Sequence, residues 1–390
     1  MDAAQPLYNL APVARMMLLG VVIALGPLAW VWLRNRHAPP AHRLRVLTLV
    51  TLFLTFDLVL FGAFTRLTDS GLGCPDWPGC YGSLSPVGAH ASISAAQEAM
   101  PTGPVTFSKA WIEMIHRYLA TAVGVLILVL AMVSWVERRR LAVSFVWPLV
   151  TLLWVCLQGA FGALTVTMKL FPAVVTLHLL GGMVLLALLR AQSVGYALAE
   201  PGHRGPVALP GRLRLALVLM TALLWLQIAL GGWVSTNYAV LACGDFPTCQ
   251  GSWWPTMDFR QGFTLWRELG QNRAGESIAF PALTAIHYTH RLVAYAVLAA
   301  LTWLGWRLRR VDGLQSTARA LLLLAAWQFA SGLTNVVLDW PLLAAVAHTG
   351  GAAAMVVVLT GALTGTRRAP EADAPRAASS SSLHLSRPTP

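Results

Sequence analysis

The stretch TRLTDSGLGCPDWPGCYG at residues 65–82 carries two cysteines with five residues between them, and the stretch STNYAVLACGDFPTCQG at residues 235–251 carries the same spacing. The equivalent cysteines lie 169 positions apart: Cys74 matches Cys243, and Cys80 matches Cys249. A constant offset between two separated loops is typical of an internal repeat. The two loops therefore predict that the chain contains two copies of one structural unit.

The similarity continues beyond these loops. The segment LQGAFGALTVTMKLFPAVVTLHLLGG at 157–182 resembles WQFASGLTNVVLDWPLLAAVAHTGGA at 327–352, with an offset of 170. Upstream of each, EMIHR at 113–117 matches HYTHR at 287–291 with an offset of 174. The matches occur in the same order in both halves, which indicates that a whole unit has been duplicated.

Composition identifies the kind of unit. The chain has 390 residues, of which 56% are hydrophobic and 11% charged, and its mean hydropathy is +0.62. A soluble fold of this length could not bury so much apolar surface, so we predict an integral membrane protein. Nine continuous apolar runs are long enough to span a bilayer as helices: 16–33, 46–64, 110–135, 143–163, 174–195, 213–234, 281–304, 316–337 and 342–364.

We therefore predict an all-α integral membrane fold of two tandem parallel four-helix bundles, an eight-helix core, with one extra N-terminal transmembrane helix. A unit with an even number of spans returns the chain to the same side, so equivalent residues share a depth. The predicted segments are 1–45 for the extra helix and a basic loop, 46–196 for the first repeat, 197–212 for a linker, 213–365 for the second repeat and 366–390 for a disordered cytoplasmic tail.

The net charge of +12 is concentrated in alternate loops. Arginines gather between spans one and two, three and four, five and six, and seven and eight, and again after the last span. By the positive-inside rule these segments face the cytoplasm. The rule places the C-terminus inside and the N-terminus and both cysteine loops on the periplasmic side, and it leaves no reason to expect a nucleic-acid partner.

Four histidines occupy equivalent places on the second and fourth helices of the two halves: His116 and His178, then His290 and His348. Each lies within about 10 Å of the outer end of its helix. A lone intramembrane histidine is more often hydrogen-bonded to a neighbouring helix. Two imidazoles that converge at one depth are instead a common way for a bundle to ligate haem. The four histidines thus predict a bis-histidine site for haem iron in each half.

Arg117 and Arg291 directly follow the first histidine of each pair. We predict that they pair with haem propionates, the alternative being interfacial arginines that extend toward the lipid headgroups. Glycines on the same helices, including Gly162 and Gly332, would let a flat macrocycle approach the backbone, or would simply allow close helix packing.

The halves differ where the first has Glu113 and the second has His287. Because Glu113 precedes His116 by three residues, it lies on the same helix face, one turn nearer the outer surface. A carboxylate beside a haem can transfer protons or stabilise positive charge, whereas the alternative is an ion pair with Arg117 or Lys109. We therefore assign catalysis to the first half and a retained, electron-carrying haem to the second.

Taken together, the two cysteine loops, EMIHR, HYTHR and the helices of His178 and His348 resemble the haem A synthase family over about 46–364. The resemblance implies a bacterial inner-membrane enzyme that oxidises the C8 methyl group of haem O to the formyl group of haem A for cytochrome c oxidase, with oxygen from water. It implies haem b at His290 and His348, substrate at His116 and His178, and Glu113 as the essential acid. An iron-bound oxidant is an alternative to stabilisation of a cation by Glu113. The extra first helix departs from the family's eight-helix pattern.

On an oxidising outer face, each cysteine pair suits a disulfide within its own loop, Cys74 with Cys80 and Cys243 with Cys249. Such a bond can be a structural staple or a redox-active pair. Zinc is disfavoured because neither loop has a second pair of ligands.

Two other functions compete with the enzyme: a di-haem electron carrier that keeps both haems, and a transporter or thiol oxidase that uses the cysteines. The candidate partners are lipid, a haem O synthase (prenyltransferase) and cytochrome c oxidase assembly factors. The sequence leaves open the electron acceptor and whether the chain forms a homo-oligomer.

Overall fold

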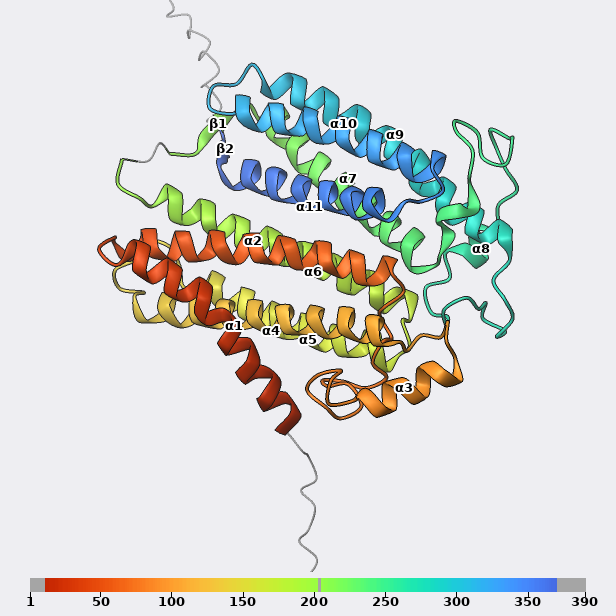
Figure 1. Cartoon of the computed structure of the whole chain (residues 1–390). Helices are drawn as coiled ribbons and strands as arrows, with labels where there is room; N and C mark the ends of the chain where they lie inside the picture. The colour runs from red at the N-terminus through yellow and green to blue at the C-terminus, as the bar shows by residue number, and fades with distance from the viewer. Residues whose placement is uncertain (1–10, 203–204, 370–390) are drawn as a thin grey trace, which may run out of the picture.

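A computed structural model describes residues 11–202 and 205–369, and long helices that lie side by side dominate it (Figure 1). In the first half the elements are α1 (Ala11–Asn35), α2 (Pro40–Leu67), α3 (His90–Ala99), α4 (Phe107–Val136), α5 (Val146–Thr167) and α6 (Pro172–Leu198). In the second they are β1 (Val207–Leu209), α7 (Gly211–Thr236), the 3₁₀ helix η1 (Ala239–Ala242), α8 (Phe259–Gly262), α9 (Phe280–Leu308), α10 (Gln315–Val337), α11 (Leu342–Thr364) and β2 (Thr366–Arg368). The predicted all-α membrane fold class is confirmed.

Eight helices of the described chain are long and apolar enough to cross a membrane: α1, α2, α4, α5, α6, α7, α10 and α11. The ninth expected span, 281–304, corresponds to α9, which has 29 residues but is not among the eight. Its polar residues His287, His290 and Arg291 lower its hydropathy where the predicted site lies. The ninth span thus meets the length requirement but not the composition requirement.

Several helices begin where proline fixes the backbone. Pro40, Pro172 and Pro281 lie in the first turns of α2, α6 and α9, where a missing N–H removes no helical hydrogen bond. The helix α4 begins instead with Thr106, whose side chain accepts a hydrogen bond from the Lys109 backbone N–H at 3.3 Å. These starts set the register of the helices that carry the candidate site.

Each half closes into a ring of four packed helices. In the first half, α2 and α5 each pack against both α4 and α6; in the second, α7 and α10 each pack against both α9 and α11. The halves meet through α6 with α11, α2 with α11, and α6 with α7, and α1 packs outside the rings on α4 and α2. Both cysteine loops leave the bundles at the end that carries α3 and α8, on the right of Figure 1.

Contacts between equivalent residues mark the axis that relates the halves. The Arg66 guanidinium donates to the Ser235 carbonyl at 2.6 Å, and the Tyr238 hydroxyl donates to the Asp69 carboxylate at 2.7 Å. Both pairs are separated by 169 residues, the offset of the repeat. Residues that contact their own repeat equivalents lie beside a two-fold axis, so the halves are related by pseudo-symmetry at this end of the molecule.

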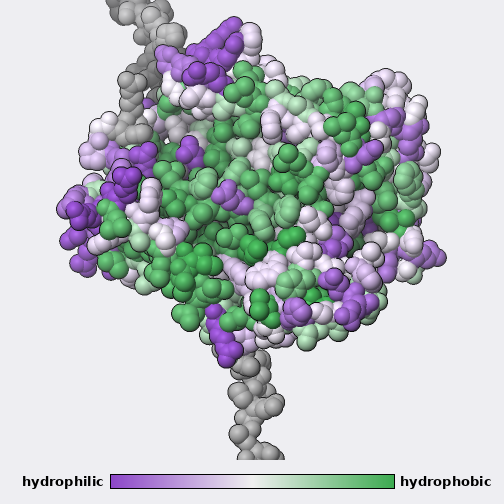
Figure 2. Space-filling model, viewed as in Figure 1, coloured by the Kyte–Doolittle hydropathy of each residue, from purple (hydrophilic) through white to green (hydrophobic). Residues whose placement is uncertain are grey.

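The core consists of aliphatic side chains shared by both rings, with Leu130, Leu186, Leu217 and Leu359 almost fully buried. Outside it, apolar side chains cover the middle of the visible face, and hydrophilic ones gather at its two ends (Figure 2). This pattern is that of a protein whose middle faces lipid.

The first residues of the predicted disordered tail have regular structure. Thr366–Arg368 form β2, which pairs in parallel with β1 of the segment between the halves. The Arg214 guanidinium donates to the Thr366 carbonyl at 2.7 Å and reinforces this junction. The expected tail therefore contains a short strand at its start, and positions 370–390 lie outside the described residues.

Candidate functional site

The four predicted histidines lie inside the two rings, each against a glycine of a neighbouring helix. A Cβ built on that glycine would lie 3.0 to 3.5 Å from the imidazole. The pairs are Gly62 with His116, Gly162 with His178, Gly231 with His290, and Gly332 with His348. A larger residue at Gly62, Gly231 or Gly332 would crowd the ring, whereas 3.5 Å at Gly162 is ordinary van der Waals contact.

The structure brings the histidines of each half together. His116 on α4 and His178 on α6 belong to opposite helices of the first ring, and His290 on α9 and His348 on α11 belong to opposite helices of the second. All four rings are only partly covered by protein. Two facing imidazoles with remaining open surface are the arrangement that binds a porphyrin iron from both sides.

The surroundings of the two pairs differ. In the second half, the Ser331 hydroxyl oxygen lies 2.9 Å from His348 Nδ1, and the amide nitrogen of Gln227 lies 3.0 Å from His290 Nδ1. In the first half, His178 Nδ1 is buried and has no hydrogen-bond partner within the described residues. The pairs are therefore alike in placement but unlike in support.

Glu113 is buried on α4 and is held from two sides. One carboxylate oxygen accepts a hydrogen bond from the Cys74 backbone N–H at 2.8 Å, and the other pairs with the Arg117 guanidinium. The sequence offered Arg117 or Lys109 as an ion-pair partner of Glu113, and the partner is Arg117. The Lys109 ammonium nitrogen lies 3.5 Å from the Asp69 carboxylate instead. The carboxylate thus links the helix that carries His116 to the first cysteine loop.

Arg117 and Arg291 direct their guanidinium groups at the cysteine loops. Arg117 donates to the carbonyls of Asp76, Pro78 and Gly79, at 2.9 and 3.2 Å for the first two and 2.5 Å for the third. Such a set of charge-assisted bonds to three carbonyls of one loop orders that loop strongly. This placement favours a loop-holding role, and the pairing with haem propionates stays a prediction.

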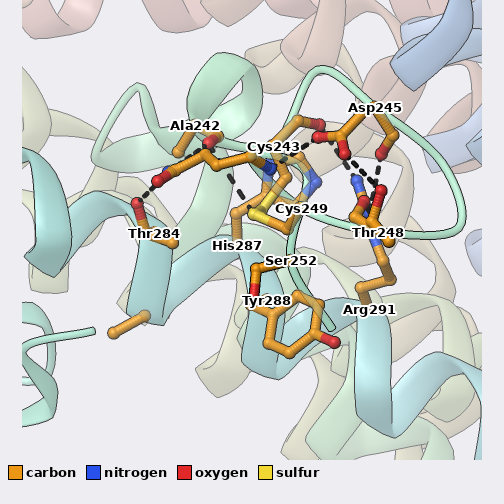
Figure 3. The surroundings of a disulfide bond; sticks show 12 residues. Ala242, Cys243, Asp245, Thr248, Cys249, Ser252, Thr284, His287, Tyr288 and Arg291 are labelled. Carbon is orange, nitrogen blue, oxygen red and sulfur yellow. Dashed lines mark hydrogen bonds between the residues drawn. A yellow bond between two sulfur atoms is a disulfide. The ribbon is translucent and has the colours of Figure 1, made fainter. Parts of the chain in front are cut away.

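The second loop repeats the arrangement (Figure 3). Arg291 donates to the carbonyls of Asp245, Thr248 and Cys243, at 2.9, 2.7 and 2.9 Å. His287, which replaces Glu113 in the repeat, is buried, and its Nδ1 lies 3.1 Å from the Ala239 carbonyl. Because His287 offers no carboxylate, the Arg291 nitrogen that corresponds to the one pairing with Glu113 donates to the Cys243 carbonyl instead.

Both predicted disulfides are present. Cys74 is bonded to Cys80 and Cys243 to Cys249, and all four residues are fully buried. The carboxylates of Asp76 and Asp245 close the turns by accepting backbone N–H groups, those of Tyr81 and Gly82 in the first loop and those of Gln250 and Gly251 in the second. Buried sulfurs within loops fixed at several points fit a structural staple better than an exposed exchangeable pair.

The donor set suits haem and not a bare metal ion. Among the described residues, no group of three or more histidine, cysteine, aspartate or glutamate side chains could hold a metal. A porphyrin supplies four ligands itself, so two imidazoles complete the iron. The paired rings, their glycine neighbours and the orphan His178 Nδ1 all fit such a group.

Several residues that support the histidine pairs and the cysteine loops were not predicted from the sequence. Ser331 and Gln227 approach the second pair of histidines, and Asp76 and Asp245 close the loops. The repeat could have indicated the aspartates, because they are 169 positions apart within matched loops. No pattern indicated Ser331, whose equivalent in the first half is Phe161.

Comparison with known proteins agrees with this geometry. Residues 45–360 match the model of the COX15-CtaA family, described as cytochrome oxidase assembly protein. The chain belongs to this family. Among its relatives, the haem A synthase of Shewanella oneidensis is 38% identical to this chain over 317 residues, which cover 80% of this chain and 92% of that protein.

More distant relatives carry the same name. The haem A synthase of Methylobacterium sp. (strain 4-46) is 31% identical over 83% of this chain and 92% of its own length. That of Halalkalibacterium halodurans is 26% identical over 75% of this chain and 86% of its own. The family match begins at residue 45, so α1 lies outside the segment that the COX15-CtaA model covers.

Proposed function

We propose that this protein is a haem A synthase, which oxidises the C8 methyl group of haem O to the formyl group of haem A for cytochrome c oxidase. Membership of the COX15-CtaA family and similarity to haem A synthases along most of the chain support the proposal. The observation that carries it is the unequal pair of sites: equivalent imidazole pairs in both halves, with a carboxylate next to only one of them.

In this proposal the first half binds the substrate. His116 and His178 hold the iron of haem O, and Glu113 lies one helical turn from His116. Oxidation of the methyl group withdraws electrons from a carbon conjugated to the macrocycle, so positive charge develops there. The carboxylate of Glu113 stabilises that charge, and water then adds as the oxygen source. Two successive two-electron oxidations with loss of protons convert the methyl group to the formyl group.

The second half holds a resident haem b between His290 and His348. When bound, haem b accepts and passes on electrons one at a time. His287 replaces the carboxylate there, so the second pocket lacks the group that would stabilise a cation. The second site thus carries electrons and leaves oxidation to the first.

We further propose that the cysteine loops face the periplasm of a bacterial inner membrane. At the opposite end, the connections between α1 and α2, α4 and α5, α6 and α7, and α9 and α10, together with the helix ends beside them, carry the arginine clusters that favour the cytoplasm. With α9 counted as a ninth crossing on the strength of its length, the N-terminus is periplasmic and the C-terminus cytoplasmic. Both haem sites lie near the periplasmic side.

The test is to express the protein in cells that supply haem O and to separate the extracted porphyrins by chromatography. We expect one haem b per chain, with haem O or haem A as the variable second occupant. Two haem b groups and no haem A would favour the di-haem electron carrier instead. Conversion lost completely on replacement of the four loop cysteines, with both haems retained, would favour a thiol oxidase.

A further inference from the structure

The two histidine pairs differ in what holds their Nδ1 atoms, and this difference separates a resident haem from an exchanging one. We propose that Ser331 is a positioning residue that fixes His348 as a permanent axial ligand, and that Phe161 at the equivalent place leaves His178 free to release its haem. The inference rests on the proposed function, because it takes haem b and haem O as the occupants.

Ser331 determines which ring nitrogen of His348 carries the proton. Its hydroxyl donates to the Trp327 carbonyl at 2.8 Å, and the same oxygen lies 2.9 Å from His348 Nδ1. A serine hydroxyl has one proton, and we assign it to the shorter of these contacts, the one to the carbonyl. The oxygen must therefore accept from Nδ1–H, which leaves the lone pair on Nε2 available for iron.

Other side chains hold the second pair through its backbone. The Gln328 side chain donates to the His348 carbonyl at 2.8 Å, and Gly332 contacts the ring. Opposite, the Gln227 amide nitrogen donates to the His290 carbonyl at 3.1 Å and lies 3.0 Å from Nδ1. An amide nitrogen only donates, so it cannot accept from Nδ1–H of His290 as the Ser331 oxygen does from His348. The ring of His348 is thus oriented before any haem enters, which lowers the entropic cost of binding.

The first half keeps a glutamine and a glycine at the equivalent positions, Gln158 and Gly162, but lacks the serine and the Gln227 equivalent. Phe161 stands where the second half has Ser331, and Leu58 stands where it has Gln227. Neither side chain can hydrogen-bond, and His178 Nδ1 is buried without a partner in the described part of the chain. A ring that must be oriented on binding holds iron less tightly, which suits a site whose product has to leave.

The decisive experiment compares haem retention in Ser331→Ala with the wild-type protein. Each purified protein is mixed with excess apomyoglobin, and haem b transfer is followed by absorbance. Loss of such a supporting hydrogen bond weakens metal binding by about 10–100-fold, so we expect transfer to quicken by a similar factor. The low-spin electron paramagnetic resonance signal of ferric haem b should also shift. Ser134→Ala, at a buried serine bonded to Tyr196 and far from both pairs, should change neither readout.

Two further variants keep the test decisive if Ser331→Ala fails to fold. Ser331→Thr retains the hydroxyl and should retain haem as the wild type does, whereas Ser331→Val has nearly the same shape without the hydroxyl and should lose it. Equal transfer rates and spectra for these two variants would overturn the role of Ser331. Absence of haem b from the wild-type protein would instead refute the proposed function, so the two failures are distinguishable.

Discussion

The carboxylate of Glu113 occupies an unusual place because it belongs to a helix yet accepts a hydrogen bond from the loop above it. Its bonds to the Cys74 N–H and the Arg117 guanidinium fix the carboxylate one helical turn from His116. In the second half, neutral His287 breaks this pattern. One substitution between the repeats therefore changes both the charge of a pocket and the grip of an arginine on its loop.

Replacing Glu113 with glutamine should stop the reaction without emptying the second site. The amide keeps the shape but carries no charge, so we expect conversion of haem O to fall by about 10²–10⁴-fold. Haem b content should be unchanged, because His290 and His348 lie in the other ring. Chromatography of extracted porphyrins measures both quantities. Glu137→Gln, at the opposite end of α4, is the matched control, and normal haem A from Glu113→Gln would remove Glu113 from the mechanism.

Asp245 gives the second loop a defined pH dependence. A hydrogen bond from the Thr248 hydroxyl, with others from the Gly251 and Gln250 N–H groups, lowers the pKa of Asp245 from 3.8 to about 2. Because the folded pKa is the lower one, the carboxylate stabilises the loop above about pH 4 and loses this effect as the pH falls through about 2.

We therefore expect a water-soluble phosphine to reduce the Cys243–Cys249 disulfide faster in Asp245→Ala than in the wild type at neutral pH. The two reduction rates should become equal near pH 2. Trapping the freed thiols of Cys243 and Cys249 and measuring their mass gives the rate. Thr248→Val should give an intermediate rate, because it removes the largest cause of the shift. A difference between Asp245→Ala and wild type that persists below pH 2 would contradict this account.

At the scale of elements, the cysteine loops are fixed by more than their disulfides. Arg117 binds three carbonyls of the first loop, and Arg291 binds three of the second. A disulfide that closes so short a ring contributes about 2 kcal/mol of loop ordering. The arginine bonds remain when the sulfurs are replaced, so the loops should loosen rather than unfold.

The double substitution of Cys74 and Cys80 by serine should thus slow haem A formation by about tenfold rather than abolish it. The cause is displacement of the Cys74 N–H from Glu113. The matched replacement of Cys243 and Cys249 should leave the Glu113 contacts intact and have a smaller effect on conversion. The rate of haem A formation from supplied haem O, measured for both variants, shows which replacement slows the reaction more. A dead enzyme in both cases would indicate redox-active cysteines.

The elements also mark the limit of what the sequence predicts. The repeat pointed to two equivalent pairs of histidines, His116 with His290 and His178 with His348, because a fixed offset and a helical period determine depth and face. The short helices α3 and α8 were not expected, since they lie in polar loops without long apolar periodicity. The turn of Arg117 toward the loop was also missed, because a side chain with several rotatable bonds finds its partners only in three dimensions.

For the whole molecule, duplication explains why two unlike sites lie at one depth. Residues that contact their own equivalents, Arg66 with Ser235 and Asp69 with Tyr238, tie the halves together at the loop end. Within that frame the differences are small and local: glutamate against histidine at 113 and 287, and phenylalanine against serine at 161 and 331. In the proposed function, the shared architecture places the two haem sites, and these substitutions distinguish them.

The helix α1 stands outside the duplicated frame and the family match, yet it packs along α4 (Figure 1). Met16, Gly20, Ala24 and Val31 form its buried face. A Cβ at Gly20 would lie 2.5 Å from the Thr121 methyl group and 3.0 Å from the Thr121 backbone carbon, so a larger side chain cannot fit without moving the helix. The packing of α1 on the helix that carries Glu113 and His116 therefore depends on this glycine.

Gly20→Val should accordingly detach α1 and lower the thermal midpoint of the protein in detergent. Gly26→Val is the matched control, because a Cβ at Gly26 meets nothing within 4 Å and the same residue type is introduced into the same helix. Since the family match starts at residue 45, we expect both variants to keep haem b and to convert haem O. Thermal unfolding followed by haem absorbance measures stability, and porphyrin chromatography measures activity. Loss of conversion in Gly20→Val alone would instead make α1 part of the catalytic half, acting through the position of α4.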